Sequence, residues 1–283
     1  MIDKKALKII NEAMAIEAQE AKEAGQLGFM ARAMVQATLP HKDPKTNEFS
    51  RTNGNYTLTL LAPSTVGLPF GSLPRLLLCW MTTEVTRTKE RTLVLGDSLT
   101  DFMRQLDMTP TGGRHGSITR LRQQMTRLFS SSVSCTYSDE ERDSGAGFRI
   151  VKGYDLWWKP QSPGQAGLWK STVTLSEDFF EEIIKSPVPL DMRALKALKQ
   201  SPMALDIYIW LTHRMSYLKK PTPIPWEALQ AQFGAEYNRA NNFRAAFKRA
   251  LANVLTVYPD AKVKADPKGL FLSPSKTHIK KIK

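Results

Sequence analysis

One order of predicted secondary-structure elements occurs twice in this chain, and this repetition constrains the fold more than any other feature. Each half has an apolar helix, a short strand, a short helix, a turn, a long basic helix and a hairpin. The two short helices share the i, i+3, i+7 spacing of a single buried face. Their apolar positions are Leu99, Phe102 and Leu106 in the first half and Trp226, Leu229 and Phe233 in the second. A helix-turn-helix followed by a β-hairpin is a winged helix, so we expect an α+β, mostly helical fold with two tandem winged-helix domains and an N-terminal helical extension.

Composition and helix-breaking residues divide the chain into three predicted parts. Residues 3–37 are rich in Ala, Glu, Lys and Met without proline, which favours a helix, interrupted near residues 25–28. Residues 40–55 are predicted to be a loop or tether, and Pro187 and Pro189 mark a domain boundary. The predicted parts are an N-terminal helical extension and tether (1–55), a first winged-helix domain (56–187), and a second winged-helix domain with a basic C-terminal tail (188–283).

The repeated elements have definite predicted ranges. In the first domain these are helices at 73–88, 99–107 and 116–130 and a short strand at 92–95. Strands at 133–137 and 148–158, joined by an acidic turn, form the predicted first wing, and residues 169–175 are a candidate third strand. The second domain has a helix at 202–218, an extended piece at 222–225, a long basic helix at 238–256 and hairpin strands at 262–264 and 270–272.

The positive charge of the chain is concentrated in its last third. The whole chain carries +13 at pH 7, and residues 191–283 hold 17 Lys+Arg against 6 Asp+Glu, a net +11. Two long stretches contain bases but no acid, between Asp107 and Asp139 and between Glu236 and Asp260. A solvated helix usually mixes charges of both signs, so these stretches predict two surfaces kept clear of phosphate repulsion.

The absence of several sequence motifs excludes some classes of protein. The two cysteines, Cys79 and Cys135, have no Cys or His nearby, which excludes a zinc finger and a disulfide scaffold. The sequence has no G-x-x-x-x-G-K-[ST] phosphate loop and no paired histidines. We therefore expect a protein that is not an enzyme and that has no metal or cofactor. No apolar run approaches the ~20 residues of a membrane span, and the first residues lack a signal-peptide core, so we expect no membrane contact and a bacterial cytoplasmic location.

Helical geometry places a polar face opposite the buried face of each long basic helix. On the first helix this face carries Arg120, Gln123 and Arg127, and on the second it carries Asn241, Asn242 and Arg249. Arg, Asn and Gln make bidentate contacts to base edges in the major groove, so we expect these helices to bind double-stranded DNA. The candidate DNA-binding residues are Arg114, Thr119, Arg120, Gln123, Arg127, Asn238, Arg239, Asn241, Asn242, Arg244, Lys248, Arg249, Lys262 and Lys264.

The remaining basic residues have simpler expected roles. Arg122 and Arg244 lie on helix flanks, where they contact phosphate or nothing, and lysines of the second wing suit phosphate contact. Lys280, Lys281 and Lys283 of the tail are expected to act without sequence preference. The acidic turn at 139–147 is a misfit in a DNA-binding wing. Either that wing points away from DNA, or the first domain docks by its helix alone.

Several long motifs resemble one family. They lie at residues 67–80, 95–99, 111–114, 118–121 and 201–214. These segments resemble the RepC-type iteron-binding replication initiators of IncQ-like broad-host-range plasmids, and the resemblance covers nearly the whole chain from residue 67 on.

The resemblance implies a function in plasmid replication. Such initiators bind direct repeats, called iterons, at the origin, and an adjacent A+T-rich segment then opens. A plasmid-encoded replicative helicase acts there, and a dimer formed through the first domain restrains copy number. Two alternatives share the sequence features: a tandem winged-helix transcriptional repressor without origin-opening activity, and an adaptor whose basic surface binds acidic protein. The two basic helices can also be ordinary solvated surface helices.

Overall fold

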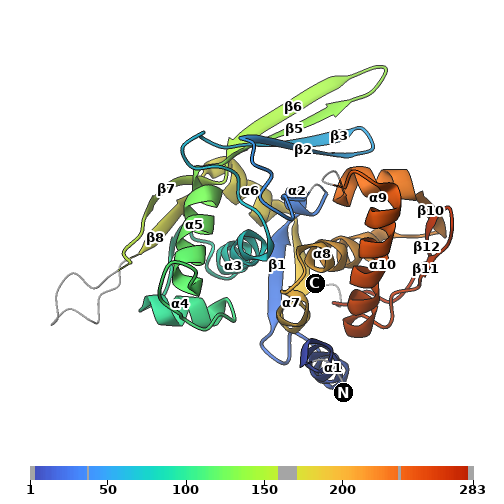
Figure 1. The fold of residues 1–283 in the computed structure, drawn as a ribbon, viewed down its shortest axis with the longest axis horizontal. Coiled ribbons are helices and arrows are strands. Elements are labelled where there is room, and N and C mark those ends of the chain that lie inside the picture. Colours follow the sequence, from blue (N-terminus) through green and yellow to red (C-terminus); the bar gives the residue numbers. More distant parts are fainter. Residues whose placement is uncertain (1–3, 37, 159–170, 235–236, 280–283) are drawn as a thin grey trace.

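The repeated order of elements is present in the folded chain. The computed structural model describes residues 4–36, 38–158, 171–234 and 237–279, and the described chain is α+β (Figure 1). The first repeat consists of α3 (Ser72–Thr88), β4 (Thr92–Val94), α4 (Leu99–Gln105), α5 (Ser117–Ser130), β7 (Val151–Asp155) and β8 (Thr172–Leu175). The second repeat consists of α8 (Pro202–Tyr217), β10 (Thr222–Pro225), α9 (Trp226–Phe233), α10 (Ala240–Val257), β11 (Val263–Ala265) and β12 (Gly269–Leu272).

Strand pairing follows one topology in both repeats. The antiparallel sheets have the orders β4-β8-β7 and β10-β12-β11, so in each repeat the last strand lies between the first two. The two long helices, α5 and α10, lie on either side of the central helices α3 and α8 (Figure 1).

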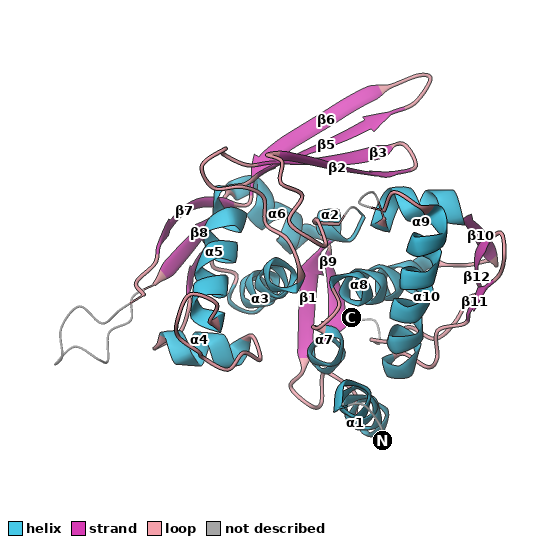
Figure 2. Cartoon of the chain, in the orientation of Figure 1, coloured by secondary structure: helices cyan, strands magenta, loops and turns pink. Residues whose placement is uncertain are grey.

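The predicted first wing is wrong in its pairing. Strands β5 (Ser132–Ser138) and β6 (Asp143–Arg149) are inserted between α5 and β7, and they extend a hairpin of β2 (Glu48–Asn53) and β3 (Tyr56–Leu61). The resulting four-stranded antiparallel sheet has the order β2-β3-β5-β6 (Figure 2). It forms because Leu60 of β3 pairs with Val133 of β5, and both side chains are fully buried. The hairpin of the first repeat is instead β7–β8, and the acidic turn belongs to the inserted hairpin.

The N-terminal residues differ from the expected helical extension and tether. They form α1 (Lys4–Ala18), β1 (Leu27–Ala31) and α2 (Arg32–Gln36), and the expected loop at 40–55 contains β2. Strand β1 pairs with β9 (Pro187–Asp191), the segment expected at the domain boundary. Both prolines of β9 are tolerated because residues two apart present their missing N–H groups to the same edge of the strand, away from β1. The domain limits at 55 and 187 stay predictions.

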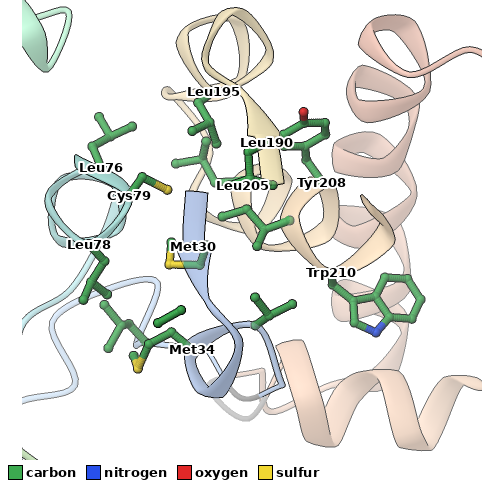
Figure 3. Packing of buried hydrophobic residues seen from close by; sticks show 14 of the residues in the cluster. Met30, Met34, Leu76, Leu78, Cys79, Leu190, Leu195, Leu205, Tyr208 and Trp210 are labelled. Carbon is green, nitrogen blue, oxygen red and sulfur yellow. The ribbon is translucent and has the colours of Figure 1, made fainter. Parts of the chain in front are cut away.

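The β1–β9 pair lies inside the core that joins the two repeats. Around it pack α3, α6 (Glu177–Lys185), α7 (Met192–Leu198) and α8. Figure 3 shows Met30 of β1 between Leu78 of α3 and Leu205 of α8, and all three side chains are buried. Apolar burial therefore runs continuously from one repeat to the other. In the described part of the chain, no helix is both long and apolar enough to span a bilayer.

A buried ionic contact crosses the same junction. Arg75 of α3 donates from Nε to Oδ1 of Asp206 at 2.6 Å and from Nη2 to Oδ2 at 2.7 Å. Its other N–H groups donate to the carbonyls of Leu39, Pro40 and Gly71. His41 Nε2 lies 2.8 Å from Asp206 Oδ2. Burial opposes ionisation of Asp206, but the charge of Arg75 and the hydrogen bonds from His41 and Arg75 outweigh it and lower its pKa to about 2.

We expect Asp206→Ala to lower the free energy of unfolding by ~3–5 kcal/mol, because it leaves the Arg75 guanidinium buried without a counter-ion. Urea unfolding at pH 7 measures the loss. The matched double variant Arg75→Met/Asp206→Leu removes both charges and is expected to unfold at a higher urea concentration than Asp206→Ala. An Asp206→Ala chain as stable as the native chain would contradict this assignment. Because the pKa of Asp206 is lowered, its contribution is complete above the usual aspartate pKa and is lost as the pH falls toward about 2.

Candidate nucleic-acid interface

A hydrogen-bonded turn sets the start of α5. The Thr111 amide donates to Ser117 Oγ at 2.8 Å, and the Ser117 amide donates to Thr111 Oγ1 at 2.9 Å. Ser117 Oγ also donates to the Thr109 carbonyl at 2.7 Å. Gly116 is the N-cap of α5, and a Cβ there would overlap the carbonyl oxygens of Thr111 and Gly112. The sequence Thr-Gly-Gly-Arg-His-Gly therefore closes a tight turn that fixes where the basic helix begins.

The predicted polar face of α5 is exposed at its first half. Arg120 and Gln123 are exposed, as is Arg114 in the preceding turn. Thr119 is partly exposed, and its hydroxyl donates to the Gly113 carbonyl at 2.8 Å. Thr119 therefore stabilises the turn, while Arg120 and Gln123 present donors to solvent.

Arg127 has a different environment from the other predicted residues of α5. Its Nη1 donates to the Leu68 carbonyl at 3.0 Å and lies 3.3 Å from Asp43 Oδ2. Its guanidinium lies 5.1 Å from the ring centre of Phe70. The structure thus places Arg127 against the loop before α3, where its guanidinium already has partners. Helical spacing alone had no signal for this contact, because Asp43 is distant in sequence.

The second basic helix presents a fuller polar face. Phe243 and Phe247 of α10 are fully buried against Trp226 of α9, with ring centres 6.4 and 5.8 Å from it. The opposite face is exposed, and it carries Asn241, Asn242, Ala245 and Arg249. Asn238 and Arg239, just before the helix, and Lys248 at the edge of this face are exposed as well. The side chains predicted to read bases on this helix therefore lie together on one solvent-facing surface.

Two cations of α10 are held against an aromatic ring. Arg244 and Lys248 lie 5.9 and 5.5 Å from the ring centre of Trp226. Arg244 Nη2 also lies 3.4 Å from Glu227 Oε1. These contacts place Arg244 on the flank of the helix, as its helical position predicts, and orient both cations without burying Lys248.

The predicted hairpin of the second repeat is confirmed as β11 and β12. Lys262, Lys264 and Lys268 on it are exposed. Asp266 accepts from the amides of Lys268 and Gly269 at 2.7 and 2.9 Å, which shapes the turn. The Trp226 indole donates to the Asp266 carbonyl at 3.0 Å, so this hairpin is docked on α9. Its lysines therefore share one rigid frame with α10.

The described acidic residues in the turn of the inserted hairpin are not arranged as metal ligands. Asp139 accepts from the Tyr137 hydroxyl at 2.5 Å and from the amides of Glu141 and Arg142. These hydrogen bonds, that of Tyr137 first, lower the pKa of Asp139 below its usual value. Among the residues that the structure describes, no three His, Cys, Asp or Glu side chains are grouped to hold a metal ion. The tail residues Lys280, Lys281 and Lys283 lie outside the described residues.

One side of α5 borders a cleft that sequence reasoning missed. The cleft has a volume of about 480 Å³ and is lined by the first repeat and by the turn that leads into the second. Arg120 and Gln123 contribute from α5, and Lys199 and Gln200 contribute from the turn between α7 and α8. No local sequence pattern could predict that these residues lie together, because α5 and the turn between α7 and α8 meet only through tertiary packing.

We expect Gly116→Ala to lower the melting temperature and weaken DNA binding, because the added methyl overlaps two carbonyl oxygens and displaces the start of α5. Overpacking of this kind typically costs ~1–3 kcal/mol. Gly112→Ala is the matched control, since nothing lies within 4 Å of a Cβ at that position. Thermal unfolding of both variants measures the difference in melting temperature. Equal melting temperatures would show that the turn accommodates the added methyl group.

The structural comparisons indicate where this fold occurs. The chain is similar to a selenomethionine derivative of domains 2 and 3 of RctB, with a TM-score of 0.55 and 12% identity over 85% of this chain and 95% of that one. A second structure of RctB domains 2–3 gives a TM-score of 0.51 and 12% identity over 84% of this chain and 93% of that one. At this identity the likeness shows the fold alone.

The sequence comparisons indicate the family. No curated protein sequence matches the chain. A family described as plasmid encoded RepA protein matches residues 68–227, which cover the whole first repeat, α8 and the start of α9. That segment is more than half of the 283 residues. The chain therefore belongs to the plasmid-encoded RepA family of replication initiators.

Proposed function

We propose that the two repeats are winged-helix domains that place α5 and α10 in successive major grooves of one DNA duplex. The shared order of helix, strand, two helices and hairpin supports this, as does the strand order in each sheet. Equivalent groove faces recur about every 10 base pairs, so one chain would cover a site of two adjacent half-sites. The hairpin β11–β12 would add phosphate contacts through Lys262 and Lys264.

The observation that carries this proposal is the exposed face of α10. Asn241, Asn242 and Arg249 lie there on a helix whose opposite face is anchored by buried phenylalanines. Asn pairs with adenine and Arg with guanine through two hydrogen bonds each, so this face can discriminate sequence. On α5, Arg120 and Gln123 keep that role, and Arg127 is assigned to holding the loop before α3.

The family gives the site of action. We infer that the chain is a RepC-type initiator that binds direct repeats at a plasmid origin in the bacterial cytoplasm. Bound copies would bend the DNA and promote opening of an adjacent A+T-rich segment, where flexible steps lower the cost of distortion. The sequence carries no phosphate-loop motif, which supports a division of labour in which a plasmid-encoded helicase supplies ATP hydrolysis. The proposed action is mechanical and involves no catalysed step.

The test is binding of the purified chain to a duplex carrying an origin repeat and to a scrambled duplex, across a salt series. We expect a preference of ~10³ or more for the repeat at physiological salt. We also expect Arg249→Ala to lose ~1–3 kcal/mol on the repeat and much less on the scrambled duplex. Equal losses on both duplexes would make Arg249 a phosphate contact. Repeat binding without reactivity of the A+T-rich flank to a probe for unpaired bases would favour a transcriptional repressor.

A second copy of the chain is the proposed partner in copy control, and β6 supplies a surface for it. This strand is at the edge of the four-stranded sheet, and all its residues except Phe148 are exposed. In its sequence, Asp-Ser-Gly-Ala-Gly-Phe-Arg, the end residues Asp143 and Arg149 are equally far from Ala146 and opposite in charge. Antiparallel pairing with a second β6 would place Asp143 opposite Arg149 of the second copy at both ends.

We expect Arg149→Asp to shift self-association, measured by analytical ultracentrifugation, toward monomer, because each end then pairs two carboxylates. Asp143→Arg is expected to do the same by pairing two cations. The double variant Asp143→Arg/Arg149→Asp restores opposite charges in a symmetric pair and is expected to recover dimerisation. Failure of the double variant to recover, with intact repeat binding, would place the dimer contact elsewhere.

A further inference from the structure

The cleft beside α5 carries a net positive charge. Lys199 donates from Nζ to the Asp107 carbonyl and to Asp107 Oδ2, the latter at 2.5 Å. Lys8 of α1 lies 3.1 Å from the same carboxylate oxygen. Burial of Asp107 opposes its ionisation, but the two lysines outweigh this and lower its pKa. The cleft lining therefore holds one carboxylate, Asp107, and two cations, Lys199 and Arg120, while Lys8 contacts that carboxylate from α1.

Several polar side chains in the cleft have N–H groups that can still donate to a further acceptor. Two of the three N–H groups of Lys199 donate to Asp107, and the third is left for a further acceptor. Gln123 and Gln200 line the same space and are exposed. A cleft of about 480 Å³ with this lining suits an anionic group with several acceptor oxygens.

The geometry of a groove-bound helix determines which anion reaches this cleft. An α-helix with its side chains is about 10–12 Å across and the major groove is about 12 Å wide, so the helix fills the groove. The phosphates of the two strands then run along its two flanks. On α5, Arg122 lies at one flank, over Trp158 at 6.0 Å, and the cleft borders the helix on the side of Arg120.

We propose that this cleft receives a backbone phosphate of the DNA strand that passes α5, so that Lys199 and Gln200, in the turn that leads into the second repeat, contact DNA read by the first repeat. The inference rests on the proposed placement of α5 in the major groove. It makes the junction between the repeats part of the binding surface. It also assigns Lys199 a contact that adds affinity without sequence preference.

The experiment measures binding of full-length variants to the repeat duplex and the scrambled duplex by fluorescence anisotropy across a salt series. Lys199→Gln is expected to weaken binding to both duplexes by a similar factor and to reduce the slope of log affinity against log salt by about 1. Asp107→Asn is expected to tighten binding to both, because it removes the one carboxylate among the described residues that line the cleft. Asparagine also tolerates the left-handed backbone at Asp107, where φ is 52°.

Lys185→Gln is the matched control, because this exposed lysine ends α6 and does not line the cleft. An unchanged salt slope for Lys199→Gln, or a loss confined to the repeat duplex, would overturn the inference. If Lys199→Gln fails to fold, as judged by urea unfolding, the Asp107→Asn arm decides, and unchanged affinity there overturns it as well. A native chain without preference for the repeat would refute the proposed function, whereas a changed salt slope would still support the cleft contact.

Discussion

The paired charges of Arg75 and Asp206 determine how the two halves of this protein meet. The two residues lie on α3 and α8, which are the first helices of the two repeats. Every N–H group of the guanidinium has an acceptor, and three of these acceptors are the carbonyls of Leu39 and Pro40 after α2 and of Gly71 before α3. A buried pair of this kind contributes little net stability compared with apolar residues, but it tolerates only one arrangement of its partners. Because α5 and α10 pack on these two helices, the same pair fixes the relative orientation of the proposed DNA-reading surfaces.

A second buried arginine attaches α1 to this frame. Arg193 of α7 pairs with Asp191 at 2.7 Å, and it donates to the carbonyls of Ala15 and Gln19 at the end of α1. It thereby supplies N–H donors to carbonyls at the helix end, where donors from within the helix are missing. Residues expected to form a separate extension are therefore integrated with the second repeat, and Lys8 of α1 reaches the charge cluster at Asp107.

Local pattern predicted the parts of this fold that depend on neighbours in sequence. The repeated order of elements, the polar face of α10 and the β11–β12 hairpin all follow from periodicity and turn residues within short windows. The errors concern pairings between distant segments. Strand β5 was predicted, but its partner β3 lies more than 70 residues earlier. Most of β6 lies in the segment expected to be a turn, because its residues are exposed and have no alternating pattern. The contact of Arg127 with Asp43 and the joining of Lys199 to the α5 cleft depend on tertiary packing in the same way.

The β1–β9 pair has a consequence for the order in which the chain assembles. Strand β1 is synthesised before β9, which is its strand partner in the described part of the chain and begins at Pro187, about 160 residues later. During that interval β1 has no paired strand, and the surface that packs against α3 lacks β9. Pairing over such a sequence separation is slow, because the entropy cost of closing the loop comes before the stabilising contacts form. The first repeat therefore completes its core only when the chain has reached the second, and the two repeats are expected to fold as one cooperative unit.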